Sequence, residues 1–271
     1  MKPYFETKLG KLYCGDCLEF MQTMEDKSVD LVVTSPPYDN LRDYKGYNFN
    51  FKDIANKLLY VLDSGGVCIW VVGDATINGS ETGTSFKQAL YFKEIGFNIH
   101  DTMIYEKNSM SMPDVVRYYQ MFEYMFVFSK GKPKIINLLK DKRNRWAGSS
   151  NFGEKSNRKK DGSLVSGGKL VVGEYGVRGN IWKYNTGKGY TTKDDYAFAH
   201  PAMFPEKLSR DQIVSWSNKN DVVLDPMCGA GTTCKMAEAT GRRWIGIEIS
   251  EKYCEIAAKR ISAEAKQGKL F

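Results

Sequence analysis

The sequence lacks the features that mark membrane, secreted and metal-binding proteins. No apolar run approaches the roughly 18 residues of a membrane span, and the N-terminus has no apolar core of the kind found in signal peptides. Histidine occurs only at His100 and His200, and the CxxC pair of Cys14 and Cys17 has no counterpart elsewhere. These absences predict a cytoplasmic protein with reduced cysteines, no membrane partner and no metal site.

Acids are scarce in one part of the chain. The net charge is +7, yet residues 140–193 hold 13 lysines and arginines against four acids, so the remainder is slightly acidic. The same segment is rich in Gly, Ser and Asn and has weak apolar periodicity, which is typical of an irregular insert. A basic run can be no more than a solvated loop. Confinement of the whole surplus to one segment nevertheless favours a surface that binds a polyanion.

The rest of the chain alternates short apolar runs with helical patterns. Strands are expected at 11–14, 30–34, 67–72, 103–106, 123–128, 222–224 and 244–248. Helices are expected at 51–62, 85–95, 233–239 and 252–263. This alternation predicts an α/β fold with a parallel sheet that is covered by helices on both faces. With 271 residues, 42% of them apolar, the chain is long enough to bury a large core.

The expected strand at 30–34 runs directly into the sequence Ser-Pro-Pro-Tyr at 35–38. Proline cannot donate to a sheet ladder, so the strand must end here. Ser35 and Pro36 each precede a proline and are therefore held in extended geometry. The result is a stiff corner whose carbonyls face no local N–H donor. It is either a loop anchor or a rigid acceptor edge that holds a flat polar ligand beside Tyr38.

A second expected strand, 222–224, leads into an acid and a turn of small residues, Asp-Pro-Met-Cys-Gly-Ala-Gly-Thr-Thr at 225–233. Gly229 and Gly231 allow a ligand to approach the backbone closely, and the N-terminus of the following helix favours polar or anionic groups. No Gly-Lys-Ser/Thr follows, so this is not a phosphate-binding P-loop. Glu248 ends the next strand, where an acid can bind the two hydroxyls of a ribose. The order and spacing of these features favour a nucleoside site over a purely structural turn.

Together the two motifs resemble the S-adenosylmethionine-dependent DNA methyltransferases that modify exocyclic amino groups. The order is that of their β group, with the catalytic motif first, the target-recognition segment in the middle and the cofactor loop last. Family-like pieces also occur at 12–17, 65–67, 123–130 and 200–205, so the resemblance covers nearly the whole chain. It implies a circularly permuted, doubly wound, Rossmann-like sheet. It also implies three parts, namely a catalytic half (1–139), a target-recognition insert (140–199) and a cofactor-binding half (200–271).

The resemblance implies that S-adenosyl-L-methionine is the cofactor and double-stranded DNA the substrate. The target amino group is a poor nucleophile, because its lone pair is delocalised into the ring. Ser35 Oγ and the Pro36 carbonyl would grip its hydrogens while Tyr38 stacks on the flipped base. The implied catalytic residues are Ser35, Pro36, Pro37 and Tyr38. The implied cofactor-binding residues are Asp16, Thr34, Asp225, Pro226, Cys228, Gly229, Gly231, Thr232 and Glu248.

The expected DNA-binding residues are basic, and most of them lie in the insert. Arg42 is the exception, because it follows the proline corner and either orders a loop over the target base or caps the next turn. The set is Arg42, Arg143, Arg145, Arg158, Lys159, Lys160 and Arg178. Their guanidinium and ammonium groups are expected mostly to hold phosphates, with a few contacting base edges.

The target base stays open at this point. Within the family, Ser-Pro-Pro-Tyr goes most often with N4 of cytosine, and Asp- or Asn-Pro-Pro-Tyr with N6 of adenine. Cytosine is therefore favoured and adenine is the alternative. An inactive DNA-binding relative is a further alternative, against which the intact Asp16, Ser35, Tyr38, Asp225 and Glu248 argue. The resemblance also allows a homodimer and a cognate restriction endonuclease, in a bacterial, archaeal or phage-encoded system.

Overall fold

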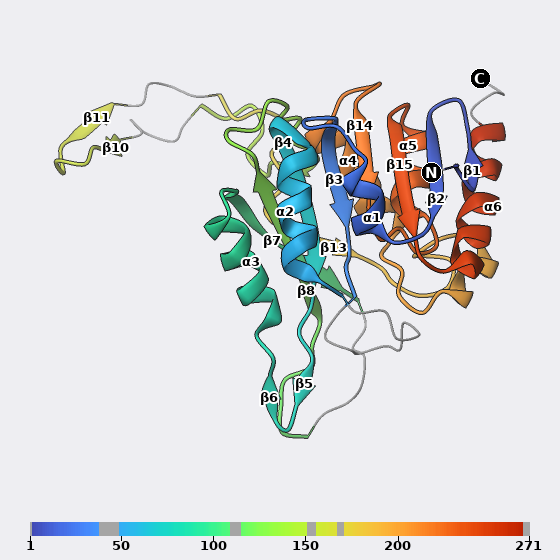
Figure 1. Cartoon of the computed structure of the whole chain (residues 1–271). Coiled ribbons are helices and arrows are strands. Elements are labelled where there is room, and N and C mark those ends of the chain that lie inside the picture. Colours follow the sequence, from blue (N-terminus) through green and yellow to red (C-terminus); the bar gives the residue numbers. More distant parts are fainter. Residues whose placement is uncertain (1, 38–48, 109–114, 151–155, 167–170, 268–271) are drawn as a thin grey trace. The chain divides into compact units, whose positions relative to one another are not determined.

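The computed structural model describes residues 2–37, 49–108, 115–150, 156–166 and 171–267 (Figure 1). The chain divides into a main unit, Met1–Asn137 with Asn180–Phe271, and a small unit, Leu138–Gly179. The small unit is shorter than the insert expected at 140–199, because residues 181–184 form a strand of the main sheet. That strand is too short for its periodicity to be recognised in the sequence.

Within the described residues, nine strands form the sheet of the main unit, in the order β1-β2-β15-β14-β3-β4-β8-β7-β13. In that order their bounds are Phe5–Glu6, Gly10–Cys14, Arg243–Glu248, Val222–Asp225, Val29–Thr34, Leu62–Val72, Phe122–Ser129, Asn98–Lys107 and Ile181–Tyr184. Neighbours from β2 to β4 are parallel. The predicted all-parallel sheet needs correction, because β1 is antiparallel to β2, and β8 is antiparallel to β4 and β7. A strand buried on both faces has the same apolar composition in either direction, so the sequence did not reveal this.

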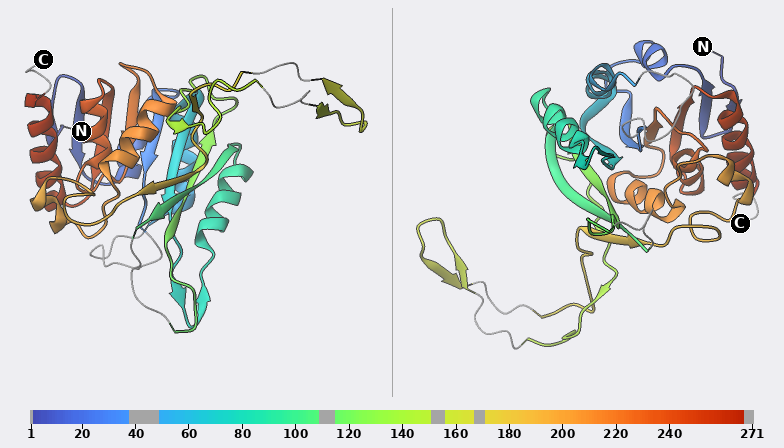
Figure 2. Two further views of the ribbon diagram at one scale, coloured as in Figure 1. Left: turned by 180° about the vertical axis from the view of Figure 1, so that it is seen from behind. Right: turned by 90° about the horizontal axis from the view of Figure 1, so that it is seen from below.

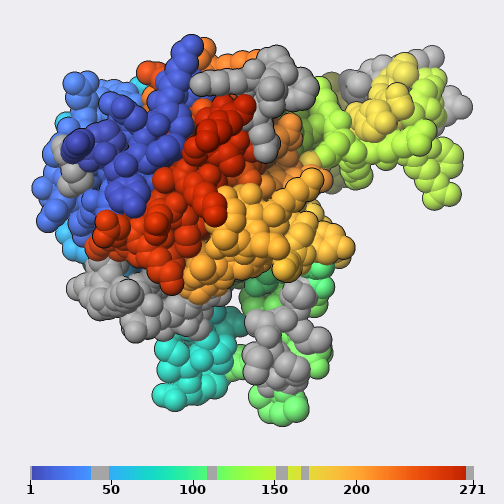
Figure 3. Space-filling model, turned by 90° about the vertical axis from the view of Figure 1, so that its right-hand side faces the viewer, coloured from blue at the N-terminus to red at the C-terminus, as the bar shows by residue number. Residues whose placement is uncertain are grey.

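Helices cover both faces of the sheet (Figure 2). One face carries α1 (Cys17–Gln22), α2 (Phe51–Val61) and α3 (Thr84–Glu94). The other carries α4 (Glu206–Trp216), α5 (Thr232–Ala239) and α6 (Glu251–Gln267). A short 3₁₀ helix, η1 (Asp195–Ala199), lies beside α6, and α6 itself lies between η1 and the N-terminal strands (Figure 3). The chain therefore has the two-faced α/β architecture that the alternating pattern predicted.

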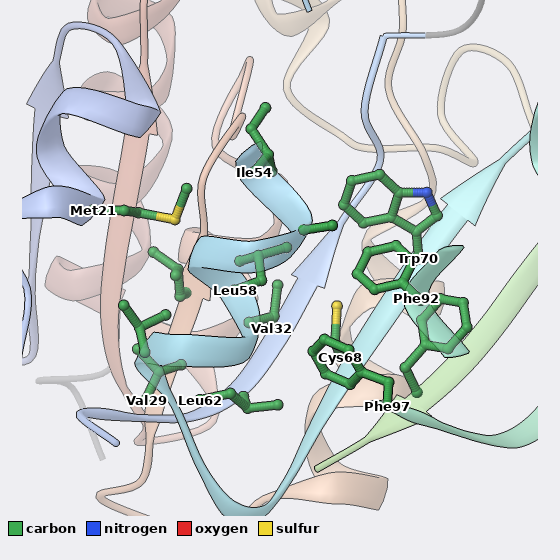
Figure 4. Close-up of a cluster of buried hydrophobic side chains, with 14 of the residues drawn as sticks. Met21, Val29, Val32, Ile54, Leu58, Leu62, Cys68, Trp70, Phe92 and Phe97 are labelled. Atoms are coloured by element: carbon green, nitrogen blue, oxygen red, sulfur yellow. The ribbon is translucent and has the colours of Figure 1, made fainter. Parts of the chain in front are cut away.

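The main apolar core lies between the sheet and α1 to α3 (Figure 4). The indole of Trp70 on β4 meets the ring of Phe92 on α3 edge-on, with 5.1 Å between ring centroids. Phe92 in turn stacks on Phe128 of β8 at 4.4 Å. The buried Trp70 Nε1 donates to Gln88 Oε1 at 2.8 Å, so its polar edge is satisfied. Each such fully buried apolar side chain stabilises the fold by about 1.5–3 kcal/mol.

The small unit is built from two short antiparallel pairs. β9 (Lys142–Arg143) pairs with β12 (Tyr175–Gly176), and β10 (Ser156–Arg158) pairs with β11 (Leu164–Ser166). None of its side chains whose exposure the structure describes is buried. Local hydrogen bonds and ion pairs therefore order this unit rather than an apolar core of its own.

Among the helices of the described residues, none has the length and apolar content that a membrane span needs. In the same residues, no three or more His, Cys, Asp and Glu side chains gather as a group that could hold a metal ion.

A further hairpin in the main unit, β5 (Thr76–Ile77) with β6 (Ser80–Glu81), follows β4.

Candidate active site

A cavity of about 670 Å³ opens at the carboxyl edge of the parallel strands, the lower edge in Figure 1. Residues that follow β2, β3, β4, β14 and β15 line it, because the carboxyl ends of parallel strands meet at one edge of a sheet. The two sequence motifs therefore converge on one cavity. Ser35, Pro36 and Pro37 line one part of it, and residues 225–230 line another.

The proline corner lies where the sequence placed it, directly after the last residue of β3, Thr34. Pro36 is buried, and Ser35 and Pro37 are half-buried. Tyr38 and Arg42 lie outside the described residues, so their predicted roles stay predictions.

The loop between β14 and α5 depends on its glycines. Gly229 has φ +51°, and a Cβ atom there would lie 2.6 Å from His200 Nε2. Gly231 has φ +74°, and its Cβ would lie 2.7 Å from the Cβ of Ala257 on α6. Both positions combine a backbone conformation that favours glycine with no space for a side chain. Gly229 faces the cavity, whereas Gly231 is absent from its lining and serves the packing of α5 on α6.

Two buried acids flank this loop. Asp225 accepts a hydrogen bond from Thr34 Oγ1 at 2.8 Å and one from the Met227 amide at 3.3 Å. Burial raises the pKa of Asp225 to about 6, although hydrogen bonds from Thr34 and Thr233 oppose the rise. Thr34 is itself fully buried, so the structure places this predicted cofactor residue behind the cavity, where it orients Asp225.

Glu248 ties the end of β15 to the glycine loop. Its Oε2 accepts from the Gly229 amide and its Oε1 from the Ser250 amide, both at 2.9 Å. Burial raises the pKa of Glu248, and these backbone hydrogen bonds oppose the rise. Glu248 also lines the cavity, so its carboxylate is within reach of a ligand there. A carboxylate fixed in this way fits the paired hydroxyls of a ribose.

Asp16 caps a helix in the structure, and its predicted contact with the cofactor stays a prediction. Its Oδ1 accepts from the amides of Leu18 and Glu19 at 2.7 and 3.2 Å, and so caps the N-terminus of α1. Its neighbours Gly15 and Cys17 line the cavity, whereas Asp16 does not. Of the other predicted cofactor residues, Pro226, Cys228 and Thr232 line the cavity.

Sequence reasoning missed a buried ionic network behind the glycine loop. Arg260 of α6 is fully buried and donates to the Ala230 carbonyl at 2.6 Å and to Thr232 Oγ1 at 3.1 Å. It also pairs with Asp194 and Glu206, which are both paired with Lys235 of α5. Burial would raise the pKa of Glu206, but hydrogen bonds from Thr192 and Lys235 hold it below its usual value. An arginine on an amphipathic helix gives no indication in sequence that it will be buried.

The segment 200–205 also contributes to the site. His200 packs against Tyr253 with ring centroids 4.4 Å apart, and both line the cavity beside Gly229. His200 Nδ1 accepts from the Ala202 amide at 3.1 Å, which fixes the orientation of the ring. The sequence showed this segment as a family-like piece, but no residue in it was assigned a role.

The predicted DNA-binding residues of the small unit have different surroundings. Arg143, Arg145 and the run Arg158, Lys159 and Lys160 are exposed. Arg145 lies over the ring of Trp146, 5.4 Å from its centroid. Arg178 is instead bound by Asp141 through several hydrogen bonds, two of them at 3.1 Å. This pair joins the two ends of the small unit, so the structure gives Arg178 a role in closing the unit.

Comparisons with known proteins agree with this geometry. A family model described as DNA methylase matches residues 29–259. The chain is 56% identical to the orphan methyltransferase M.BamHII of Bacillus amyloliquefaciens over 241 residues, which cover 89% of this chain and 91% of that protein. It is 28% identical to the type II methyltransferase M.ScaI of Streptomyces caespitosus, over 98% of this chain and 85% of that one.

Solved structures show the same fold. The PvuII DNA methyltransferase, described as cytosine-N4-specific, matches with a TM-score of 0.70 at 21% identity, over 98% of this chain and 94% of that one. A putative DNA modification methylase of Thermus thermophilus, solved with S-adenosyl-L-methionine, matches with a TM-score of 0.63 at 23% identity, over 94% of this chain and 93% of that one.

Proposed function

The chain belongs to the family of S-adenosylmethionine-dependent DNA methylases that act on exocyclic amino groups, and from this membership we propose that it methylates N4 of a cytosine in duplex DNA. The observation that carries the proposal is the single cavity that joins the Ser35–Pro36 corner to the glycine loop. The cytosine-N4-specific PvuII enzyme shares this fold. Serine rather than aspartate or asparagine at position 35 favours cytosine over adenine, which is the alternative target.

The cofactor half of the cavity fits S-adenosylmethionine, which supplies an electrophilic methyl group on a sulfonium. Gly229 lines this half of the cavity without a side chain, and the Glu248 carboxylate can accept from ribose hydroxyls. Arg260, held behind the loop, fixes the Ala230 carbonyl and Thr232, so the loop is shaped before the ligand arrives. Preorganisation of this kind lowers the cost of binding.

The proline corner supplies two acceptors for the target amino group. When Ser35 Oγ and the Pro36 carbonyl bind its two hydrogens, the nitrogen lone pair is directed away from the ring and toward the methyl group. The same acceptors stabilise the positive charge that develops on nitrogen during transfer. Direct transfer then needs no covalent bond to the enzyme, because the nitrogen is held in line with the methyl carbon. A cytosine paired within a duplex cannot reach these groups, so we infer that the base is flipped out, and Tyr38 is the predicted stacking partner.

The proposal is tested by sequencing DNA from a host that expresses the protein, with a chemistry that distinguishes N4-methylcytosine from N6-methyladenine and gives the recognition sequence. Methylated cytosine at one sequence motif supports it. Methylated adenine would establish the alternative, and unmethylated DNA from a folded, cofactor-binding protein would indicate an inactive DNA-binding relative. The predicted homodimer and cognate restriction endonuclease stay predictions.

Ser35→Ala tests the acceptor role directly. The change removes one of two acceptors and leaves the Pro36 carbonyl, so we expect the single-turnover rate to fall about tenfold or more with low residual activity. Cofactor affinity should remain unchanged. Ser28→Ala is the matched control, because the Ser28 hydroxyl donates to the Glu25 carbonyl outside the cavity. A Ser35→Ala rate equal to that of the control would remove Ser35 from the mechanism.

A further inference from the structure

The cavity extends beyond the proline corner to a lysine–glutamate pair. Lys107, at the end of β7, donates from Nζ to Glu123 Oε1 on β8 at 3.1 Å, and both residues line the cavity with Ser35. Their side chains are about one-fifth exposed, so the pair is largely screened from water. Nothing in the proposed transfer step uses this pair, although two charged groups are kept within the cavity.

Strand alternation places the pair on the same face of the sheet as Ser35. Val32, Trp70 and Phe126 belong to the core beneath α1 to α3, so Ser35 and Glu123, three residues away from Val32 and Phe126, face the opposite side. On that side Gln212 of α4 donates to the sulfur of Met125, two residues after Glu123. The serine and the ion pair therefore face one another across β4.

A glycine lies beside the ion pair. The register continues from Val72 opposite Tyr124, which places Gly73 opposite Glu123, and Gly73 also lines the cavity. β3 and β8 are two strand spacings apart, or about 10 Å. Thr34 lies opposite Trp70, so Ser35 comes opposite Val71, two residues before Gly73, and a ligand that contacts both Ser35 and the ion pair lies obliquely across β4. Gly73 adds no side chain to this part of the cavity, which Ser35, Lys107 and Glu123 also line.

Resting on the function proposed above, we propose that Lys107, held by Glu123, selects cytosine by donating a hydrogen bond to the carbonyl O2 of the flipped base. Cytosine carries its amino group and O2 on one edge of the ring, so Ser35 can bind one end and Lys107 the other. Adenine has a C–H group where cytosine has O2, and it offers no acceptor to the ammonium. Glu123 balances the charge of Lys107 and fixes its direction.

The test measures single-turnover methylation of duplexes that carry the protein's own recognition sequence, with either cytosine or 2-thiocytosine at the target position. Sulfur is a weak acceptor, so wild type should methylate cytosine about tenfold faster than 2-thiocytosine. Lys107→Met should methylate cytosine about tenfold more slowly than wild type and should lose the preference for oxygen, because the variant has no donor at this position. Cofactor affinity should not change in either protein.

Two further variants separate recognition from folding and from phosphate binding. Glu123→Gln keeps the lysine donors, so it should be slower than wild type but retain the preference for oxygen. Lys183→Met is the matched control, because Lys183 pairs with Glu106 at 2.6 Å on the neighbouring strands and neither residue lines the cavity. It should behave as wild type.

A Lys107→Met variant that keeps the wild-type preference for oxygen would overturn the inference, even if all its rates fell, since that pattern would indicate a phosphate contact or a structural role. A wild-type protein that shows no preference would overturn it as well. These outcomes differ from failure of the proposed function, in which wild type methylates adenine instead of cytosine.

Discussion

Asp225, at the residue scale, is an acid whose surroundings disfavour its charge. It is fully enclosed, and its pKa of about 6 exceeds the ordinary 3.8. The folded state therefore holds the proton more tightly than the unfolded chain does. The stability that this provides is present at low pH and is lost as the pH rises from about 4 through about 6.

Asp225→Asn is expected to remove this pH dependence while keeping an acceptor for Thr34. A shift of about two pKa units corresponds to about 3 kcal/mol. The difference in the free energy of unfolding between the variant and wild type should therefore change by about that amount, in favour of the variant, between pH 4 and pH 7. Urea unfolding across this range measures it. Asp195→Asn, at an exposed side chain, is the control. A constant difference between Asp225→Asn and wild type would show that burial does not penalise the charged form.

The sequence predicted that the two motifs come together at one site, but it did not predict which of their residues line the cavity. Ser35, Gly229 and Glu248 could be assigned to the cavity because each lies at or shortly after the end of a strand that the pattern revealed. Thr34 and Gly231 lie in or next to the same motifs and yet do not line the cavity. Arg260 and Lys235 could not be found, because their burial depends on how α5 and α6 pack, which no local pattern encodes.

At the element scale, the expected strands and helices of the main unit are confirmed, with ends that differ by a few residues. The clearest omission is α4, whose buried face mixes apolar with polar side chains, namely Leu208, Ile213 and Trp216 with Ser209, Asp211, Gln212 and Ser215. A helix with so mixed an inner face has only a weak apolar stripe to detect. Some of its buried polar groups have distant partners, as when Tyr184 of β13 donates to Asp211 Oδ2 at 2.8 Å.

Helix α1 was also not predicted. Because Asp16 caps it, Asp16 has two candidate roles, capping of the helix and contact with the cofactor. If Asp16 serves the helix, Asp16→Ala should lower the free energy of unfolding by about 1 kcal/mol, and Asp16→Ser should restore most of it, because serine also caps. The cofactor affinity of both variants should then be similar to that of wild type. Calorimetric titration and urea unfolding measure the two quantities. Weak cofactor binding by a stable Asp16→Ser protein would instead support the predicted contact of Asp16 with the cofactor.

At the scale of the whole molecule, the first and last elements of the main unit are neighbours. β2 pairs with β15, and α6 packs against both. A circularly permuted sheet requires that its N- and C-terminal elements lie next to one another. The permutation itself stays a prediction. The small unit contributes most of the net positive charge, with ten lysines and arginines against four acids in residues 138–179.

The described side chains of the small unit are not buried, so its exposed basic groups can contact a polyanion. Replacing them removes no buried core. Reversing Arg158, Lys159 and Lys160 to glutamate should therefore weaken DNA binding more than tenfold and lower the slope of log K against log salt by up to about 3, since each phosphate contact contributes about one counterion. Fluorescence anisotropy at several salt concentrations measures both. Reversing the exposed Lys52, Lys87 and Lys93 of α2 and α3 makes the same change in net charge and is the matched control. If the two triple variants lose affinity equally, net charge alone accounts for the effect, and the 158–160 run is not a DNA contact.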